Sequence, residues 1–587
     1  MKRMLSIISL LVAVFVFAMT SNVSAQAKGD TLFIPGSQSL QISTLINTDA
    51  ASATPHKVYV LDRGAIYYIE KAFEIGHSCK FIAKGTSTLR PPVLSVAIRA
   101  DNSNEEWYFK LIKEGIKVEI SDYYLLSMRS DKKTLGWSRA IHIGSNKVSL
   151  KLRRVIFDAF TEAGIRIDGA DFVKLDVQDC HFRNFIHSTS YFGGQPFLSN
   201  NNDHPDSTIF INNTFYACNS YLFSIRGYGP KNVFEHNTIV YTAVNPFLTR
   251  TADNLHVNNN LFYAVHAWGG DPEQTIGGWF LNYPDTISSS ILQIRKKMNY
   301  YGKYATTGPE IHYDDLKIPY VPSKRVFVAQ NNAYFNPAKL VSFYKSWNDT
   351  VKTKDSVEVI TGKKQYLTRK LTMADWINGL GKTVIDSLTN PKQWDYSKFV
   401  SVANNVNVDP TFTDAGVVAH IDELIGYVNR IASRKLDNPW HYKLAFPPAW
   451  PIPENLAYTN STLVKGGTDG YAVGDLNWFP TQKNQWVKTD IQTDPSAAMP
   501  TQYSLEQNYP NPFNPTTNIK FSVPQQGKFT VRVFDLLGRE VATLFNGVVN
   551  AGVHSVTFNG DKLSSGIYFY NLVGDKVNIT KKMMLIK

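Results

Sequence analysis

The stretch Phe234–Thr242, with the sequence FEHNTIVYT, contains an asparagine, one spacer residue and then a large apolar residue. Variants of this pattern recur along the chain as FINNTFYAC from Phe210, HVNNNLFYAV from His256 and VAQNNAYFNP from Val328. The large apolar residues of three successive copies, Phe215, Ile239 and Phe262, are 24 and 23 residues apart. A repeated period of this length, made of short β-rich segments, is typical of a solenoid.

The residue pattern inside each repeat indicates which solenoid it is. Weaker copies of the large apolar residue occur at Phe157, Phe182 and Tyr334. Apolar and polar residues alternate, Val, Ile, Phe and Thr are frequent, and a 3.6-residue apolar stripe is missing, which excludes helical repeats. The leucine framework of leucine-rich repeats is also missing. The sequence therefore predicts an all-β fold, a right-handed parallel β-helix with three short strands per coil.

Four asparagines, Asn213, Asn237, Asn260 and Asn332, take equivalent positions in this pattern. We expect them at one corner of the coil, where a tight bend separates two strands. Asn tolerates the left-handed backbone of such a bend better than other non-glycine residues, and its amide can bond the same residue one coil away. The large apolar residue two positions later then points into the interior and forms the core.

The first 25 residues have the features of a secretory signal peptide. Lys2 and Arg3 precede an apolar run from Met4 to Met19, and the small residues of Val23–Ala25 suit a cleavage site. No later stretch reaches the roughly 18 consecutive apolar residues that a membrane helix needs. The sequence predicts a secreted protein without a transmembrane span.

Residues 26–480 are assigned to the β-helix region, with an aromatic insertion at 264–324 and a partly helical C-terminal cap at 336–480. Helical patterns at 373–388 and 420–436 are expected to cover an open end of the solenoid, because exposed strand edges invite aggregation. A polar linker is expected at 481–502. The three cysteines, Cys79, Cys180 and Cys218, have no CxxC spacing and are interpreted as buried apolar residues rather than as a disulfide or metal site.

Residues 503–587 differ in character from the solenoid. Alternating apolar runs divided by Gly and Pro turns predict a small antiparallel, immunoglobulin-like β-sandwich. The segment resembles the type A C-terminal sorting domain of the type IX secretion system, on the motifs Asn508–Pro515, Val533–Asp535 before Gly538, Leu563–Tyr568 and Lys581–Met583. The resemblance implies export by the type IX machinery to the medium or the outer cell surface. An ordinary accessory β-sandwich is the alternative.

The formal net charge of the chain is +12 at pH 7. On an exported protein this charge favours an acidic polysaccharide or an anionic cell surface, rather than nucleic acid, as the partner. A solvated basic surface without a partner is the alternative.

Residues 57–415 resemble the pectate-lyase-like superfamily of secreted proteins, on the repeat period and the Asn corners. The resemblance implies a substrate groove along an outward-facing column on the strand after each large apolar marker. Residues nine and eleven positions after the marker are expected to point outward. They are Arg166 and Asp168, Tyr191 and Gly193, Ser224 and Arg226, and Leu248 and Arg250. The segment 193–206 and the insertion that contains Trp268 are expected to form the walls of the groove.

Arg226 and Arg250 are the main catalytic candidates. Coils stack about 4.8 Å apart, so guanidinium groups on successive coils repel each other unless an anion lies between them. A uronate carboxylate is such an anion, and β-elimination requires it to be neutralised while a base removes the adjacent proton. Lyases of the superfamily commonly use Arg or Lys, so Arg226 is assigned as base and Arg250 as carboxylate clamp. A guanidinium, however, deprotonates with difficulty.

Asp168 lies in the same column and is the third catalytic candidate. Arg166, Tyr191 and Trp268 are the candidates for substrate binding. The sequence leaves the sugar and the oligomeric state open.

Calcium is the metal that the resemblance suggests. Asp168 and the loop residues Asp203, His204 and Asp206 do not assemble the six to eight oxygen ligands that calcium needs. The metal therefore stays unassigned.

Three classes of function remain. A lyase acting on an acidic polysaccharide is favoured by the fold, the charge and the arginine pair. A noncatalytic glycan-binding or surface-structural β-helix is compatible with the incomplete catalytic motifs. A glycoside hydrolase ranks third, because it needs paired carboxylates and the expected column contains only Asp168.

Overall fold

The computed structural model describes most of the chain outside three larger gaps. The described residues are 26–133, 135–136, 138–187, 193–199, 203–225, 229–244, 246–249, 255–265, 267, 327–350, 357–360, 363–366, 400–432, 440–488, 491–494, 502–524, 527–549, 552–561, 563–574 and 576–586. The expected signal peptide, the helical pattern at 373–388 and nearly all of the aromatic insertion lie outside these residues.

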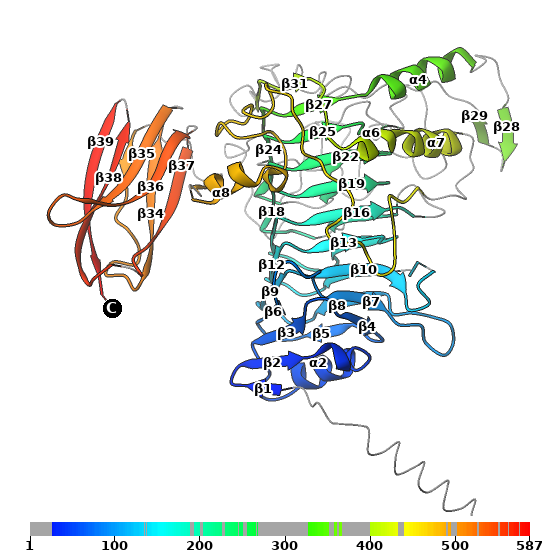
Figure 1. The fold of residues 1–587 in the computed structure, drawn as a ribbon, viewed down its shortest axis with the longest axis horizontal. Coiled ribbons are helices and arrows are strands. Elements are labelled where there is room, and N and C mark those ends of the chain that lie inside the picture. The colour runs from blue at the N-terminus through cyan, green and yellow to red at the C-terminus, as the bar shows by residue number, and fades with distance from the viewer. Residues whose placement is uncertain are drawn as a thin grey trace, which may run out of the picture.

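Three long sheets form the walls of a solenoid, and their strands follow one another in the order B, C, A in each coil (Figure 1). Sheet A consists of β1 (Gln26–Lys28), β2 (Thr31–Ile34), β3 (Val58–Asp62), β6 (Cys79–Lys84), β9 (Lys117–Ser121), β12 (Ser149–Arg153), β15 (Lys174–Gln178), β18 (Ser207–Ile211), β21 (Asn232–Glu235), β24 (Leu255–Asn258), β26 (Phe327–Gln330) and β30 (Val400–Ala403). Sheet B consists of β4 (Ile66–Ile69), β7 (Val93–Val96), β10 (Tyr124–Arg129), β13 (Ile156–Asp158), β16 (His181–Phe185), β19 (Thr214–Cys218), β22 (Thr238–Thr242), β25 (Leu261–Tyr263), β27 (Ala333–Phe335) and β31 (Val406–Asn407). Sheet C consists of β5 (Phe73–Ile75), β8 (Trp107–Leu111), β11 (Arg139–Ile143), β14 (Ala163–Ile167), β17 (Gln195–Ser199), β20 (Phe223–Ile225) and β23 (Phe247–Thr249).

All of these strands pair in parallel except β1, which is antiparallel to β2. Parallel pairing of strands from successive coils is the defining feature of a β-helix, so the predicted architecture is confirmed.

The register of sheet B confirms the repeat that the sequence predicted. The apolar markers pair with one another from coil to coil, as Phe157 with Phe182, Phe182 with Phe215, Phe215 with Ile239, Ile239 with Phe262 and Phe262 with Tyr334. The rings of Phe157, Phe182 and Phe215 stack with centroids 4.7 and 4.9 Å apart. These residues belong to one apolar interior, which extends from Leu32 to Ala329.

The corner asparagines form a continuous chain of amide hydrogen bonds. The backbone N–H and Nδ2 of Asn213 both donate to Oδ1 of Asn237, each at 2.9 Å. Asn237 donates in the same way to Asn260, Asn260 to Asn332, and Asn332 to Asn405, with distances of 2.8–3.0 Å. Asn405, which the sequence analysis did not include, is therefore the fifth member of this asparagine ladder.

One part of the corner prediction was wrong. The left-handed backbone belongs to the residue before each ladder asparagine, namely Asn212, His236, Asn259, Asn331 and Asn404, with φ between 50° and 58°. Hydrogen bonding to the next coil and turning of the chain are therefore carried out by two different residues. The ladder asparagine must direct its amide along the solenoid axis, whereas the residue before it only has to adopt the left-handed backbone. Residues other than asparagine, such as His236, can therefore occupy the left-handed position.

Helices cover the first coils of the solenoid and the outer face of one sheet. Helix α2 (Ile42–Ala50) covers the first coils, and Ile42 and Ile46 are fully buried in the apolar interior. Helix α7 (Ile421–Ala432) was predicted, but it packs on the outer face of sheet B rather than over an open end. It covers Tyr216, Tyr241 and Tyr263 there, together with α6 (Ala415–Ala419) and α4 (Ala338–Thr350). Burial of these outward-facing rings removes a large apolar area from water and so stabilises the packing of the helices on sheet B.

Residues 440–458, named here the strap, continue along the outer face of sheet B (the yellow trace in Figure 1). Leu444, Phe446 and Ile452 of the strap pack against Val93 and Tyr124 of sheet B. The strap therefore reaches back along the solenoid as far as the coil that contains β7. The region 336–480, which was predicted to be a cap, largely covers the outer face of sheet B.

The C-terminal residues form two antiparallel four-stranded sheets. One contains β32 (Ile491–Asp494), β37 (Gly552–Asn559), β34 (Thr516–Val523) and β33 (Ser504–Leu505), and the other contains β36 (Glu540–Val549), β35 (Gly527–Phe534), β38 (Gly566–Gly574) and β39 (Val577–Leu585). Their facing side chains form a separate apolar core.

The predicted linker at 481–502 is partly structured. Helix α8 (Pro480–Lys488) overlaps the expected range, and β32, which pairs with β37 of the sandwich, lies within it. The three cysteines are buried and free, as predicted.

Replacement of Asn237 by alanine is expected to destabilise the solenoid by about 3 kcal/mol, because the backbone N–H of Asn213 and the carbonyl of Phe210 lose their buried partners. Urea-induced unfolding measures this change. Asn407→Ala, at an exposed position of β31, is the matched control and should change the free energy of unfolding by less than about 0.5 kcal/mol. Equal losses for the two variants would contradict a stabilising role for the ladder.

Candidate functional site

The outer face of sheet C carries the column of residues in which the sequence analysis placed the site. The strand register aligns one residue from each coil, in the order Glu74, Lys110, His142, Arg166, Leu198, Ser224 and Leu248. Polar and charged residues therefore occupy the column from β5 to β14.

Two of the six predicted site residues are described, and the structure brings them together. Arg166 lies in β14 and Asp168 directly after it, and Nη2 of Arg166 is 2.9 Å from Oδ2 of Asp168. Arg226, Arg250, Tyr191 and Trp268 lie outside the described residues.

The strands that lead to the two arginines are in register. Ile225, which precedes Arg226, pairs with Thr249, which precedes Arg250. The expected alignment of these two coils is therefore correct up to the residue before each arginine.

The coil between Phe182 and Phe215 does not follow the expected register. Leu198 pairs with Arg166 and with Ser224, at the position that the sequence analysis gave to Tyr191. The segment 193–206, expected to form a wall of the groove, contains the strand β17. The prediction counted nine residues from the marker Phe182 and was wrong because this coil is longer than its neighbours. The extra residues come before β17 and not after it.

The acidic residues of this segment have structural partners. Oδ1 of Asp203 accepts hydrogen bonds from the backbone N–H groups of Gly169 and Ala170, and His204 contacts Asp171 at 2.8 Å. Within the described parts of the chain, no group of three or more His, Cys, Asp or Glu residues could hold a metal ion.

Four further residues, which were not predicted from the sequence, belong to this part of the face. Lys110 and His142 lie in the column itself. Trp107 and Arg139 are backbone pairing partners at the starts of β8 and β11. The imidazole of His142 lies 4.7 Å from the Trp107 ring, centroid to centroid, and the guanidinium carbon of Arg139 lies 5.3 Å from the same ring. These residues were missed because their coils precede the first recognisable marker, Phe157.

Carboxylates balance much of the positive charge on this face. Arg139 lies 2.9 Å from Glu106 and 3.7 Å from Glu162, and Lys110 lies 3.8 Å from Glu105. Burial raises the pKa of Glu162, but His187, Arg139 and Arg166 outweigh burial and lower it overall. Asp168 is therefore not the only acid on this face, contrary to the expectation from sequence.

The environment of His142 favours the neutral form of its imidazole. Burial lowers the pKa of the imidazole; Asp168 opposes this, whereas Arg166, Lys110 and Arg139 lower the pKa further. The net shift is downward from the ordinary value of 6.5. A neutral imidazole can accept a proton or a hydrogen bond from a bound molecule.

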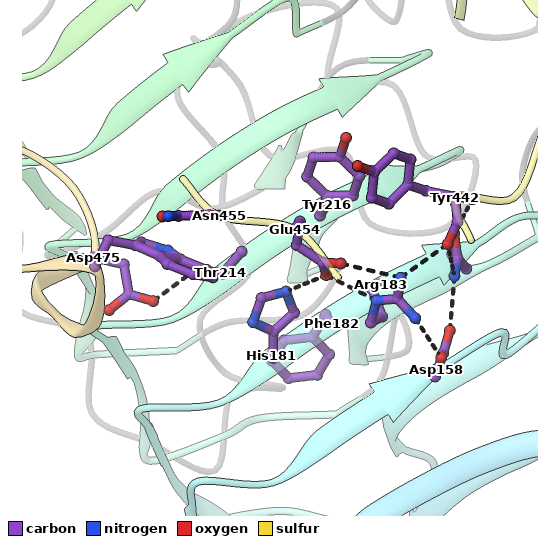
Figure 2. A network of polar contacts seen from close by, with 12 residues as sticks. Asp158, His181, Phe182, Arg183, Thr214, Tyr216, Tyr442, Glu454, Asn455 and Asp475 are labelled. Carbon is purple, nitrogen blue, oxygen red and sulfur yellow. Dashed lines mark hydrogen bonds and ion pairs between the residues drawn. The ribbon is translucent and has the colours of Figure 1, made fainter. Parts of the chain in front are cut away.

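A second polar cluster lies on sheet B beneath the strap (Figure 2). The guanidinium of Arg183 donates to Oδ2 of Asp158 at 2.6 Å, to Oε1 of Glu454 at 2.8 Å and to the carbonyl of Tyr442 at 2.8 Å. His181 Nε2 lies 2.9 Å from the same oxygen of Glu454. The side chains of Arg183, Asp158 and Glu454 are at most 2% exposed, so this cluster holds the strap on the sheet and is closed to a polymeric substrate.

A related contact holds the residues that follow the strap. Thr214 donates to Oδ2 of Asp475 at 2.7 Å, and the Trp478 indole N–H donates to Thr214 at 2.8 Å. Burial raises the pKa of Asp475 to about 7. Both clusters therefore attach the strap and the residues that follow it to sheet B. Neither cluster is the candidate site.

Glu454→Gln is expected to lower the free energy of unfolding by about 3 kcal/mol at pH 7, because it leaves the Arg183 charge poorly compensated in a buried place. Burial raises the pKa of Glu454, but Arg183 and His181 lower it to about 2, below its ordinary 4.5. The stabilisation is therefore complete above pH 4.5 and is lost as the pH falls through about 2.

Urea unfolding of wild type and Glu454→Gln at pH 7 and pH 3 measures both effects, and the difference between the two proteins should shrink at the lower pH. Glu119→Gln removes the surface pair with Lys80 and is the control, with an expected loss below about 1 kcal/mol. A pH-independent difference would contradict the role given to the Glu454 charge.

Comparison with known proteins bears on the C-terminal sandwich. Residues 507–587 match the family model of the secretion system C-terminal sorting domain. No curated protein and no solved structure matches the chain. In the described residues, none of the helices is both long and apolar enough to span a membrane. The chain is a parallel β-helix protein with a type IX secretion sorting domain, which marks proteins for the cell surface or for release.

Proposed function

We propose that this exported β-helix acts on an acidic polysaccharide by lyase-type β-elimination, along the outer face of sheet C. The export signal gives the protein access to extracellular glycans, and the parallel β-helix supports the resemblance to the pectate-lyase-like superfamily. The net charge of +12 favours an acidic ligand.

The observation that carries the proposal is the register of β20 and β23. Because Ile225 pairs with Thr249, the chain enters Arg226 and Arg250 from adjacent strands of one sheet. Adjacent strands are about 4.8 Å apart, a spacing at which one carboxylate could contact both guanidinium groups. Arg166 belongs to the same sheet, two coils earlier.

The proposed reaction needs three contributions from the protein. Cations neutralise the uronate carboxylate, which makes the adjacent carbon-bound proton more acidic. A base takes this proton, and the electron pair of the broken C–H bond forms a C=C bond as the neighbouring C–O bond to the next sugar breaks. The leaving oxygen then accepts a proton. Arg226 is assigned as base and Arg250 as carboxylate clamp, and Asp168 is the third catalytic candidate. Arg166, Tyr191 and Trp268 are assigned to substrate binding.

Noncatalytic glycan binding is the second candidate function. The cations described on sheet C are each paired with a carboxylate, as in Arg166 with Asp168 and Arg139 with Glu106. Paired charges of this kind can hydrogen-bond sugar hydroxyl groups without catalysing elimination.

Arg226→Ala and Arg250→Ala are expected to lower kcat/KM for elimination at least about 100-fold, because they remove the assigned base and the carboxylate clamp. The measurement follows the absorbance of unsaturated uronate and the release of reducing ends, with the mature full-length chain on pectate, alginate and glycosaminoglycans. Lys151→Ala on the outer face of sheet A is the control and should retain wild-type activity.

Reducing ends without the absorbance would indicate a hydrolase. Retention on a glycan column without any cleavage would instead support the noncatalytic alternative. Both results would contradict the proposed lyase.

Deletion of residues 503–587 is expected to abolish delivery to the cell surface or the medium, because it removes the whole matched sorting domain. Immunodetection in culture medium and on intact cells, compared with the full chain carrying the same tag, measures delivery. Unchanged surface delivery of the truncated chain would contradict the role of this domain.

A further inference from the structure

We propose that His142 is the base that removes the proton in this elimination, and that Lys110 and Arg166 hold the substrate carboxylate on either side of it. This inference rests on the proposed function and replaces Arg226 as the base, while Arg226 and Arg250 remain cations that contact neighbouring sugars of the acidic chain.

The backbone register puts the three side chains in one row. His142 pairs with Lys110 of β8 and with Arg166 of β14, so one cation lies one coil before it and another one coil after it. All three positions are partly exposed on the outer face of sheet C. With strands about 4.8 Å apart, a uronate that binds either cation brings the carbon next to its carboxylate close to the imidazole.

The orientation of the His142 imidazole is restricted by its contacts. The Trp107 ring lies 4.7 Å away between ring centroids, at an interplanar angle of 39°. Gly144 comes two residues after His142, and a Cβ atom at this position would lie only 2.8 Å from Cε1 of His142. Glycine at this position therefore leaves room for the ring, and Trp107 limits its movement. Among the described residues, neither imidazole nitrogen has a hydrogen-bond partner.

Burial and the charged groups around His142 together lower the pKa of its imidazole and favour the neutral form. The charged groups are Lys110 from β8, Arg139 from its own strand, and Arg166 and Asp168 from the end of β14. Burial and the cations Arg166, Lys110 and Arg139 outweigh Asp168 and keep the pKa of His142 below 6.5. Most of the imidazole is therefore available as a base at neutral pH.

The two cations retain donors for a ligand. Lys110 Nζ is 3.8 Å from its partner Glu105, a distance too long for a strong hydrogen bond. The Arg166 side chain is 24% exposed and contacts Asp168 through Nη2. A bound carboxylate would compete with Glu105 and Asp168 for these two cations.

An imidazole is also chemically better suited than a guanidinium. Guanidinium groups stay protonated at any physiological pH, so Arg226 could act as a base only in its rare neutral form. In the proposed step the carbon-bound proton moves to His142, the C=C bond forms, and the C–O bond to the leaving sugar breaks. Water supplies the proton for the leaving oxygen, and the imidazolium returns its proton to solvent.

The test compares His142→Gln and His142→Ala with Arg226→Ala in the mature full-length chain, on the glycan that wild type cleaves. If His142 is the base, both His142 variants lose at least about 100-fold in kcat, while retention on an immobilised glycan changes less than about threefold. Added imidazole restores part of the activity of His142→Ala. Arg226→Ala mainly raises KM. His256→Gln, on sheet A, is the folding-matched control.

The pH profile gives an independent readout. For wild type, kcat/KM should rise with pH through a pKa below 6.5 and then level off, because only the neutral imidazole accepts the proton. This acidic limb should disappear in His142→Gln. A His142→Gln enzyme with activity within twofold of wild type, or the loss of elimination only in Arg226→Ala, would overturn the assignment of His142 and leave the lyase function intact. Absence of unsaturated uronate with wild type on every glycan would overturn both.

Discussion

The amide hydrogen bonds of the asparagine ladder are the constraint on which the later coils of the solenoid depend. From Asn237 to Asn405, each Oδ1 accepts two donors from the preceding coil, and each ladder Nδ2 also donates to a strand carbonyl, as Asn237 does to Phe210. These groups lie in a dry corner, where an unpaired amide is costly. A slip of one residue would break every such bond and reverse the faces of the strand. The ladder therefore sets the register of the apolar stack and of the outward columns.

Register is also what connects the fold to function. Residues separated by more than twenty positions in sequence become neighbours about 4.8 Å apart, so Lys110, His142 and Arg166 form one row although no local motif contains them. Sheet B, by contrast, is closed by the strap and α7, and its charged residues serve to hold that cover. The strap and α7 do not cover the outer face of sheet C, where Lys110, His142 and Arg166 form a partly exposed row.

Several elements could be predicted from the sequence because their signals are local. Asn213, Asn237, Asn260 and Asn332 with their apolar neighbours predicted the coil period and its pairing, and the alternating runs after Tyr503 predicted the sandwich. The site was predicted less well. Arg166 and Asp168 were found by counting from Phe157, and the same count failed at Tyr191, where the coil is longer and Leu198 takes the place. Trp107, Lys110, Arg139 and His142 were missed, because the coils before Phe157 lack the Asn-x-apolar marker.

The sequence by itself determined the solenoid, the sorting domain and the buried state of the cysteines, because each depends on residue spacing or composition within a short stretch. Only the tertiary structure decided which sheet the C-terminal segment covers and which side chains meet in the outward row. Both depend on contacts between distant coils, such as Arg183 with Glu454, 271 residues apart, and such contacts leave no periodic signal in the chain. These contacts depend on the position of each coil in the stack, and that position exists only in the folded solenoid.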